Sequence, residues 1–174
     1  MTHAETSGKR QGATRRDFLK NSAILASAAV AGSGGIARNA YAAGSDIIKV
    51  GMIGCGGRCT GAAVQALNAD PGVRLVAMCD ILDERIKAKR ERLKQQFKDR
   101  IMVDDDHCFP GFDGYKHVIE SSDVVLIANA AKFHPFHTLQ ALKAGKHVFV
   151  EKPHGIDPLG IKVLNQAVAL AKKK

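Results

Sequence analysis

Short apolar runs alternate with amphipathic segments from residue 47 onward, and this alternation limits the possible folds more than any other feature of the chain. The apolar runs predict buried strands, which we place at Ile47–Ile53, Arg74–Cys79, Val124–Ala128 and His147–Val150. The segments between and after them predict helices, which we place at Ala62–Asn68, Asp83–Lys98, Tyr115–Ile119, Pro135–Lys143 and Pro158–Lys172. The polar, glycine-rich segment Asp104–Gly114 is expected to be a loop.

Uninterrupted apolar strands that are separated by helices are typical of a parallel sheet with helices on both faces. The sequence therefore predicts an α/β fold built on a doubly wound parallel sheet. In such a sheet a ligand binds at the carboxyl ends of the strands, where the strand order reverses. The turns that directly follow the strands are therefore the places to look for functional residues.

The composition is that of an ordinary globular protein, with 45% hydrophobic and 25% charged residues in 174. This excludes a disordered tail, a collagen-like rod and a disulfide-dense miniprotein. The formal charge is +9, but no nucleic-acid recognition motif accompanies it, and basic runs of this kind are usually solvated helix faces. The chain has no Trp and 5% aromatic residues, so no nucleic-acid partner is expected.

Residues 1–42 have the pattern of a targeting segment. The basic sequence Thr14–Lys20 (TRRDFLK) precedes the apolar stretch Ala23–Ala37, and the small-x-small pattern Ala40–Ala42 follows as a cleavage site. The apolar stretch is short and interrupted by glycines, so no membrane span is expected once the segment is removed. The segment resembles the twin-arginine signal of bacteria. That resemblance implies transport by the twin-arginine export machinery and a periplasmic or otherwise exported protein.

The cysteines are Cys55, Cys59, Cys79 and Cys108, and none forms a CxxC pair. We expect them to be small buried side chains, although an exported location would also permit a Cys55–Cys79 bridge. His134 and His137 share one helix face, but no carboxylate or Cys partner accompanies them. No metal site is therefore expected.

A glycine-rich turn, Gly54–Gly61 (GCGGRCTG), directly follows the first predicted strand. A dinucleotide site needs one glycine for the tight turn, a second where the backbone meets pyrophosphate, and a third where helix and strand pack closely. Gly54 and Gly56 fill the first two places, and Cys59 occupies the third. The alternative interpretation is a glycine-rich turn that binds no ligand.

Asp80 ends the second predicted strand, 26 residues after Gly54. A carboxylate at this place accepts hydrogen bonds from the ribose hydroxyls of the adenosine half. It would also repel a 2′-phosphate. The sequence therefore favours NAD over NADP as the cofactor.

These features resemble the Gfo/Idh/MocA oxidoreductase family. The resemblance rests on the glycine turn, Asp80, the helix start at His134-Pro135, the segment Gly145–Pro153 (GKHVFVEKP), and the segment Asp104–Tyr115 (DDDHCFPGFDGY). It is greatest to the exported members with a twin-arginine signal. It implies that residues 43–174 form a Rossmann NAD(P)-binding domain, and that the chain stops before the family's second, α+β substrate domain.

The resemblance also implies which residues contact the nicotinamide dinucleotide. These are Gly54, Gly56, Gly57, Arg58, Asp80, Asn129, His134, Glu151 and Lys152. Asn129 stands where the family usually has Thr. Lys152 is the implied catalytic residue, because an ammonium group beside the reacting carbonyl orients substrate hydroxyls and stabilises developing alkoxide charge.

The implied function is the NAD-binding, N-terminal part of an oxidoreductase that acts on a sugar or cyclitol. Since no general base is evident here, the chain is expected to be inactive alone, with the sugar-like substrate bound only by a full-length parent. Two alternatives remain. The chain is a non-catalytic nucleotide-binding module, or it belongs to an NAD-dependent glycosidase.

Overall fold

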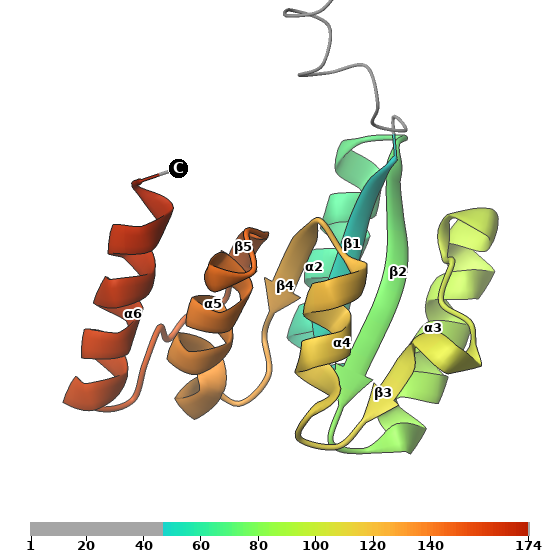
Figure 1. The fold of residues 1–174 in the computed structure, drawn as a ribbon. Coiled ribbons are helices and arrows are strands. Elements are labelled where there is room, and N and C mark those ends of the chain that lie inside the picture. The colour runs from blue at the N-terminus through green and yellow to red at the C-terminus, as the bar shows by residue number, and fades with distance from the viewer. Residues whose placement is uncertain (1–46, 174) are drawn as a thin grey trace, which may run out of the picture. The chain divides into compact units, whose positions relative to one another are not determined.

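Five parallel strands form one sheet in the computed structural model, which describes residues 47–173 (Figure 1). The strands are β1 (Ile48–Ile53), β2 (Val73–Asp80), β3 (Cys108–Pro110), β4 (Val124–Ile127) and β5 (His147–Val150). Their order in the sheet is β3-β2-β1-β4-β5. The chain builds outward from β1 to β3 and then crosses to the other side of β1, so the strand order reverses between β1 and β4.

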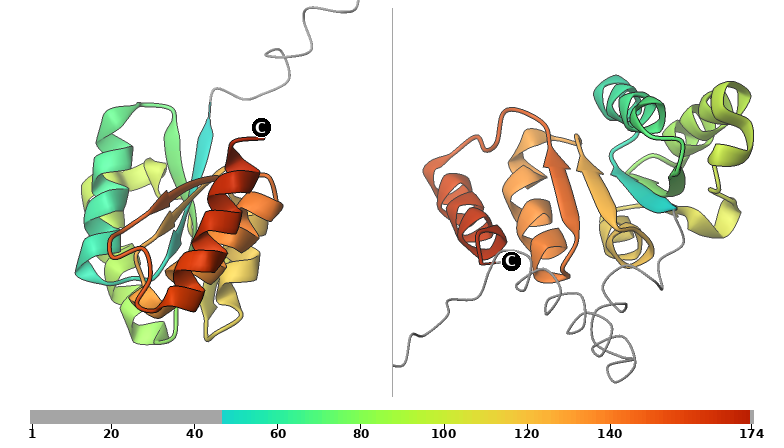
Figure 2. Two further views of the ribbon diagram at one scale, coloured as in Figure 1. Left: turned by 90° about the vertical axis from the view of Figure 1, so that its left-hand side faces the viewer. Right: turned by 90° about the horizontal axis from the view of Figure 1, so that it is seen from above.

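Helices cover both faces of the sheet. They are α2 (Gly57–Ala69), α3 (Asp83–Phe97), α4 (Gly114–Ser121), α5 (His134–Lys143) and α6 (Pro158–Ala171). The right-hand view of Figure 2 shows α2 and α3 on one face and α4 and α5 on the other, with α6 alongside α5. The predicted doubly wound α/β fold is therefore confirmed. No helix among residues 47–173 is long and apolar enough to cross a membrane.

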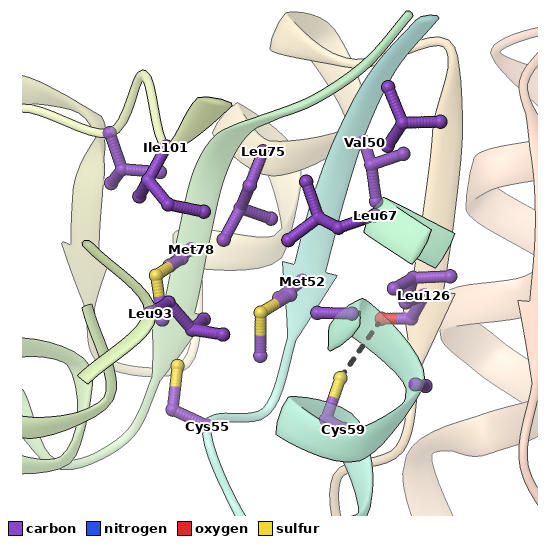
Figure 3. Packing of buried hydrophobic residues seen from close by; sticks show 14 of the residues in the cluster. Val50, Met52, Cys55, Cys59, Leu67, Leu75, Met78, Leu93, Ile101 and Leu126 are labelled. Atoms are coloured by element: carbon purple, nitrogen blue, oxygen red, sulfur yellow. Dashed lines mark hydrogen bonds between the residues drawn. The ribbon is translucent and has the colours of Figure 1, made fainter. Parts of the chain in front are cut away.

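Side chains of the central strands pack under both helix layers. On the face of α2 and α3, Met52, Leu75 and Met78 lie against Leu67 and Leu93, and all five are almost fully buried (Figure 3). On the opposite face, side chains of β1, β2 and β4 pack against α4 and α5, among them Ile53, Ala77, Val118, Ile127 and Ala141. Both layers exclude water, so the sheet holds the strand ends in fixed positions.

The predicted elements differ from the observed ones mainly at their ends. The segment Asp104–Gly114, expected to be a loop, contains the short 3-10 helix Asp105–His107, β3 and the first residue of α4. With only three residues, β3 is too short to show a period-two pattern, and its pairing with β2 defines it. The first helix also begins at Gly57 instead of Ala62, since glycines hide a helical start from propensity arguments.

All four cysteines are free, so the Cys55–Cys79 bridge considered above does not form. Cys55, Cys59 and Cys79 are buried, as expected, whereas Cys108 is half-buried. Burial raises the pKa of both Cys59 and Cys79 to about 12. These two thiols therefore act as small apolar side chains at neutral pH.

Gly51, in the middle of β1, allows the close approach of α4. A Cβ atom at this position would lie 2.6 Å from Val118 Cγ1 and 2.8 Å from Ser122 Oγ. Gly61 in α2 is a matched control, because a Cβ there would meet nothing within 4 Å.

Replacement of Gly51 by Ala is expected to lower the free energy of unfolding by about 1–3 kcal/mol, because the added methyl group overpacks the β1–α4 contact. Gly61→Ala is expected to raise it by up to about 1 kcal/mol, through helix propensity. Urea denaturation of the two variants and the natural chain measures both effects. Equal stability of the Gly51→Ala variant and the natural chain would contradict the close contact between β1 and α4 at Gly51.

Candidate functional site

The turn after β1 is held between the ends of β2 and β4. The Gly54 N–H donates to Cys79 O at 2.8 Å, and Gly54 has a φ of +98°, in the region that favours glycine. A Cβ atom at Gly54 would lie 2.9 Å from the Asn129 backbone. Gly54 is therefore required both by its conformation and by the closeness of the β4 end.

The next two glycines leave the beginning of α2 open. A Cβ atom at Gly56 or Gly57 would meet nothing within 4 Å. Helix α2 has no side-chain cap and no acidic residue in its first turn, so its first N–H groups point to open space. A helix N-terminus of this kind attracts phosphate groups through its free N–H donors and its dipole.

Cys59 fits at the position of the third glycine. Its side chain is fully buried, with Sγ lying 3.6 Å from Leu126 O and 3.8 Å from Ile53 O (Figure 3). The thiol thus fills the space between α2 and the strands beneath it. Having Cys59 in place of the motif's third glycine therefore leaves the glycine turn and the start of α2 intact.

Asp80 lies at the end of β2, beside the glycine turn. Its Oδ2 accepts a hydrogen bond from the Cys55 N–H at 2.7 Å, and its Oδ1 accepts one from the Leu82 N–H at 3.1 Å. Each carboxylate oxygen has capacity for a second donor. The carboxylate is therefore fixed by the backbone and still able to accept hydrogen bonds from a ligand.

A cavity of about 580 Å³ opens between the ends of β2 and β4. Its walls include Gly54, Gly56, Asp80, Arg85 and Asn129, together with an aromatic group that consists of Phe112, Tyr115, Phe133, Phe136 and His137. The volume and the combination of apolar rings with a few polar groups are typical of small-molecule sites. This aromatic group was not predicted from the sequence, because its members come from two distant loops and helices.

An ion pair joins the other side of the turn to the segment after β5. Arg58 Nε and Nη2 both lie 2.7 Å from Glu151 Oε2. The hydrogen bond from Arg58 lowers the pKa of Glu151. Lys152 follows Glu151 and is exposed, and the Lys152–Pro153 peptide bond is cis.

His134 is buried beside the cavity and does not line it. Its Nδ1 lies 2.9 Å from Pro153 O and its Nε2 lies 3.0 Å from Asn129 O. Both ring nitrogens therefore face backbone carbonyls, and the ring connects the loop after β4 with the loop after β5.

His137 lines the cavity and contacts the same loop. The Asn129 Nδ2 atom lies 3.1 Å from His137 Nδ1, and the imidazole stacks on Phe133 with an interplanar angle of 19°. Burial, and then the charge of His134, lower the pKa of His137 to about 4. Its ring is therefore neutral at pH 7.

The structure thus places the predicted residues in two groups along one edge of the sheet. Gly54, Gly56, Asp80 and Asn129 line the cavity, and Arg58, Glu151 and Lys152 lie on the β5 side of the turn. Residues 47–173 contain no group of three His, Cys, Asp or Glu side chains that could hold a metal ion. The strand order, the glycine turn and the acid after β2 define a nucleotide-binding domain of the Rossmann type.

Comparison with known families identifies the chain more closely. The model of the Gfo/Idh/MocA family, described as an oxidoreductase family with an NAD-binding Rossmann fold, matches residues 48–174. The chain belongs to this family, and it forms the family's N-terminal nucleotide-binding domain.

Curated relatives are identical to this chain at about a third of the aligned positions. A glycosyl hydrolase family 109 protein of Bacteroides fragilis is 32% identical over 111 residues, which are 62% of this chain and 23% of that protein. One from Solibacter usitatus is 30% identical over 155 residues, covering 80% of this chain and 33% of that protein. The aligned part of the chain thus spans 23% to 33% of the length of these relatives.

Solved structures include dehydrogenases of cyclitols. Myo-inositol 2-dehydrogenase from Lactobacillus plantarum matches with a TM-score of 0.56 and 25% identity over 71% of this chain and 33% of that one. The 3-ketoreductase KijD10 from Actinomadura kijaniata, solved with NADP, has a TM-score of 0.53 and 27% identity over 73% of this chain and 34% of that one. The fold of residues 47–173 is therefore that of the first part of such enzymes.

Acid is expected to destabilise the chain through His137. The pKa of this residue is lower in the folded state than its ordinary value of 6.5, so the unfolded chain binds more protons between about pH 6.5 and 4. The contribution of His137 to the free energy of unfolding is then fully present above about pH 6.5, and at pH 5 it is smaller by about 2 kcal/mol. Urea denaturation at pH 7 and pH 5 measures this loss. His137→Gln, which does not titrate, should lose less than the natural chain, and an equal loss would remove His137 as the cause.

Proposed function

We propose that the chain binds NAD across the carboxyl edge of the sheet. The observation that carries this proposal is the open beginning of α2 behind Gly56 and Gly57, with Asp80 and an aromatic-lined cavity beside it. The pyrophosphate would lie on the free N–H groups of α2, where the helix dipole favours negative charge. The adenosine half would enter the cavity, and the nicotinamide half would extend toward Glu151 and Lys152.

Asp80 supports NAD over NADP. Its carboxylate lies in the cavity wall with acceptor capacity left for ribose hydroxyls, and it would repel a 2′-phosphate. Arg85 lines the same cavity and is the cation that would compete with this repulsion. We propose that the repulsion of a 2′-phosphate by Asp80 outweighs its attraction by Arg85, since the backbone N–H groups of Cys55 and Leu82 hold the Asp80 carboxylate in place.

A titration of the chain with NADH and NADPH tests this proposal. Because the chain lacks Trp, nicotinamide fluorescence is followed with little protein emission. We expect saturable binding, with NADH about tenfold tighter than NADPH. Asp80→Asn keeps an oxygen for the Cys55 N–H and removes the charge, so it should bring the two affinities close together. Absence of NADH binding by a folded natural chain would overturn the proposed function.

For the parent reaction we propose hydride transfer at a sugar or cyclitol carbon. A bound nicotinamide would supply hydride chemistry, and in this proposal Lys152 would orient the substrate oxygen and stabilise its negative charge. The names of the inositol dehydrogenases with this fold support a polyol substrate. Glu151 is a poor general base, because Arg58 lowers its pKa. We therefore propose that these 174 residues bind the cofactor but do not turn over alone.

An NAD-dependent glycosidase is the second candidate, favoured by the curated relatives that are named glycosyl hydrolase family 109 proteins. The two candidates differ in their products. Net NADH formation with a sugar or cyclitol supports the oxidoreductase, whereas release of reducing sugar without net NADH supports the glycosidase. A protein in which this sequence continues into a substrate domain is the sample for this test.

We further propose that residues 1–42 direct the chain to the periplasm through the twin-arginine machinery. The support is the sequence Thr14–Lys20 with its adjacent Arg15 and Arg16, and the segment lies outside the described residues. In a bacterium with this machinery, fractionation should find the natural chain in the periplasm and the Arg15→Lys, Arg16→Lys double variant in the cytoplasm. Export of both to the same extent would contradict the proposal.

A further inference from the structure

His137 is a polar side chain of the cavity to which the proposed function gives no role. It lies in the first turn of α5 and is 7% exposed, and its ring forms part of the cavity wall. Three aromatic neighbours fix the ring: its centroid lies 4.6 Å from that of Tyr115, 5.7 Å from that of Phe136 and 5.8 Å from that of Phe133. The position of each ring nitrogen is therefore fixed by packing.

The hydrogen bond with Asn129 decides which nitrogen of His137 carries the proton. Asn129 Nδ2 lies 3.1 Å from His137 Nδ1, so the amide donates and Nδ1 accepts. The reverse amide orientation would place both Asn129 N–H groups where its Oδ1 now lies buried without a partner. A neutral imidazole that accepts at Nδ1 has its proton on Nε2.

The Nε2 N–H has no acceptor among residues 47–173. No hydrogen bond joins it to these residues, and it is not among the buried polar atoms that lack partners, so the atom is reachable from the cavity. The low pKa of the ring, about 4, keeps it neutral and this N–H in place at pH 7. A donor that faces the cavity in this way can pair with an acceptor atom of a ligand that enters it.

We propose that His137 selects the base of the bound dinucleotide, by donating its Nε2 N–H to an acceptor nitrogen of adenine in the aromatic cavity. This inference rests on the proposed function, and it assigns one residue and one atom to base recognition. The surrounding rings pack against the base, and packing of that kind accepts any base. The Nε2 N–H adds selectivity, because a base without an acceptor at this point leaves the donor unpaired.

Two variants that differ by one methylene group separate the donor from the ring. Gln at position 137 can place an amide N–H near the position of Nε2, whereas Asn cannot reach it. NADH binding to the full chain is expected to fall about five- to tenfold for His137→Asn and to stay within about twofold for His137→Gln. His117→Asn is the control, since His117 is exposed on α4 and packs on Phe109, outside the cavity.

Reduced nicotinamide mononucleotide, which has no adenosine half, is the second probe. Its affinity should be weaker than that of NADH and the same for all four chains. If His137→Asn and His137→Gln lose NADH affinity equally, or if neither variant loses any, the assignment of the Nε2 N–H as donor is overturned. Equal affinities of the two probes for the natural chain would overturn the inference and leave nicotinamide binding intact. No NADH binding by the natural chain would overturn the proposed function, and this inference with it.

The proton position can also be measured in the natural chain itself, with the His137→Asn variant used only to assign the resonances. In a ¹⁵N-histidine sample at pH 7, the His137 resonances should show a protonated Nε2 and a bare Nδ1, and the Nε2 signal should shift when NADH is added. The spectrum of His137→Asn identifies the resonances by their absence. A proton on Nδ1, or an Nε2 signal that NADH leaves unchanged at saturation, would overturn the inference.

Discussion

The close approach of Gly54 to the end of β4 is the constraint on which the rest of the site depends. Its N–H is bonded to Cys79 O on one side, and the Asn129 backbone leaves no room for a Cβ atom on the other. This contact fixes the start of α2 relative to β2 and β4. Because α2 begins where the strand order reverses, its free N–H groups face the crevice between those strands.

The strands and helices were predictable to the extent that each was long enough to show its own period. The sequence of β4 is an uninterrupted apolar run and that of β1 is apolar except for Lys49, and both were found. Strand β3 was not, because three residues carry no pattern and the pairing with β2 defines it. Cys59 occupies the place of the third glycine, and the sequence could not show that the strands leave space for a thiol there.

The site was predictable where a motif combines residue type with spacing, as for the glycine turn and Asp80. It was not predictable where long-range packing decides. His134 was expected to contact the cofactor, and the structure places both of its ring nitrogens against backbone carbonyls. The aromatic cavity wall joins the β3–α4 region to α5, and no sequence period relates Phe112 to Phe136.

For the NAD site proposed above, the Arg58–Glu151 ion pair would make phosphate recognition by Arg58 an exchange of partners. The Arg58 guanidinium group already holds a carboxylate at 2.7 Å. When it turns to a pyrophosphate oxygen, the net gain is only the difference between the free energies of the new and the old ion pair. Glu151 is then released beside Lys152, where a carboxylate and an ammonium group can pair directly. Occupation of the phosphate half of the crevice would thereby change the charge environment of the other half.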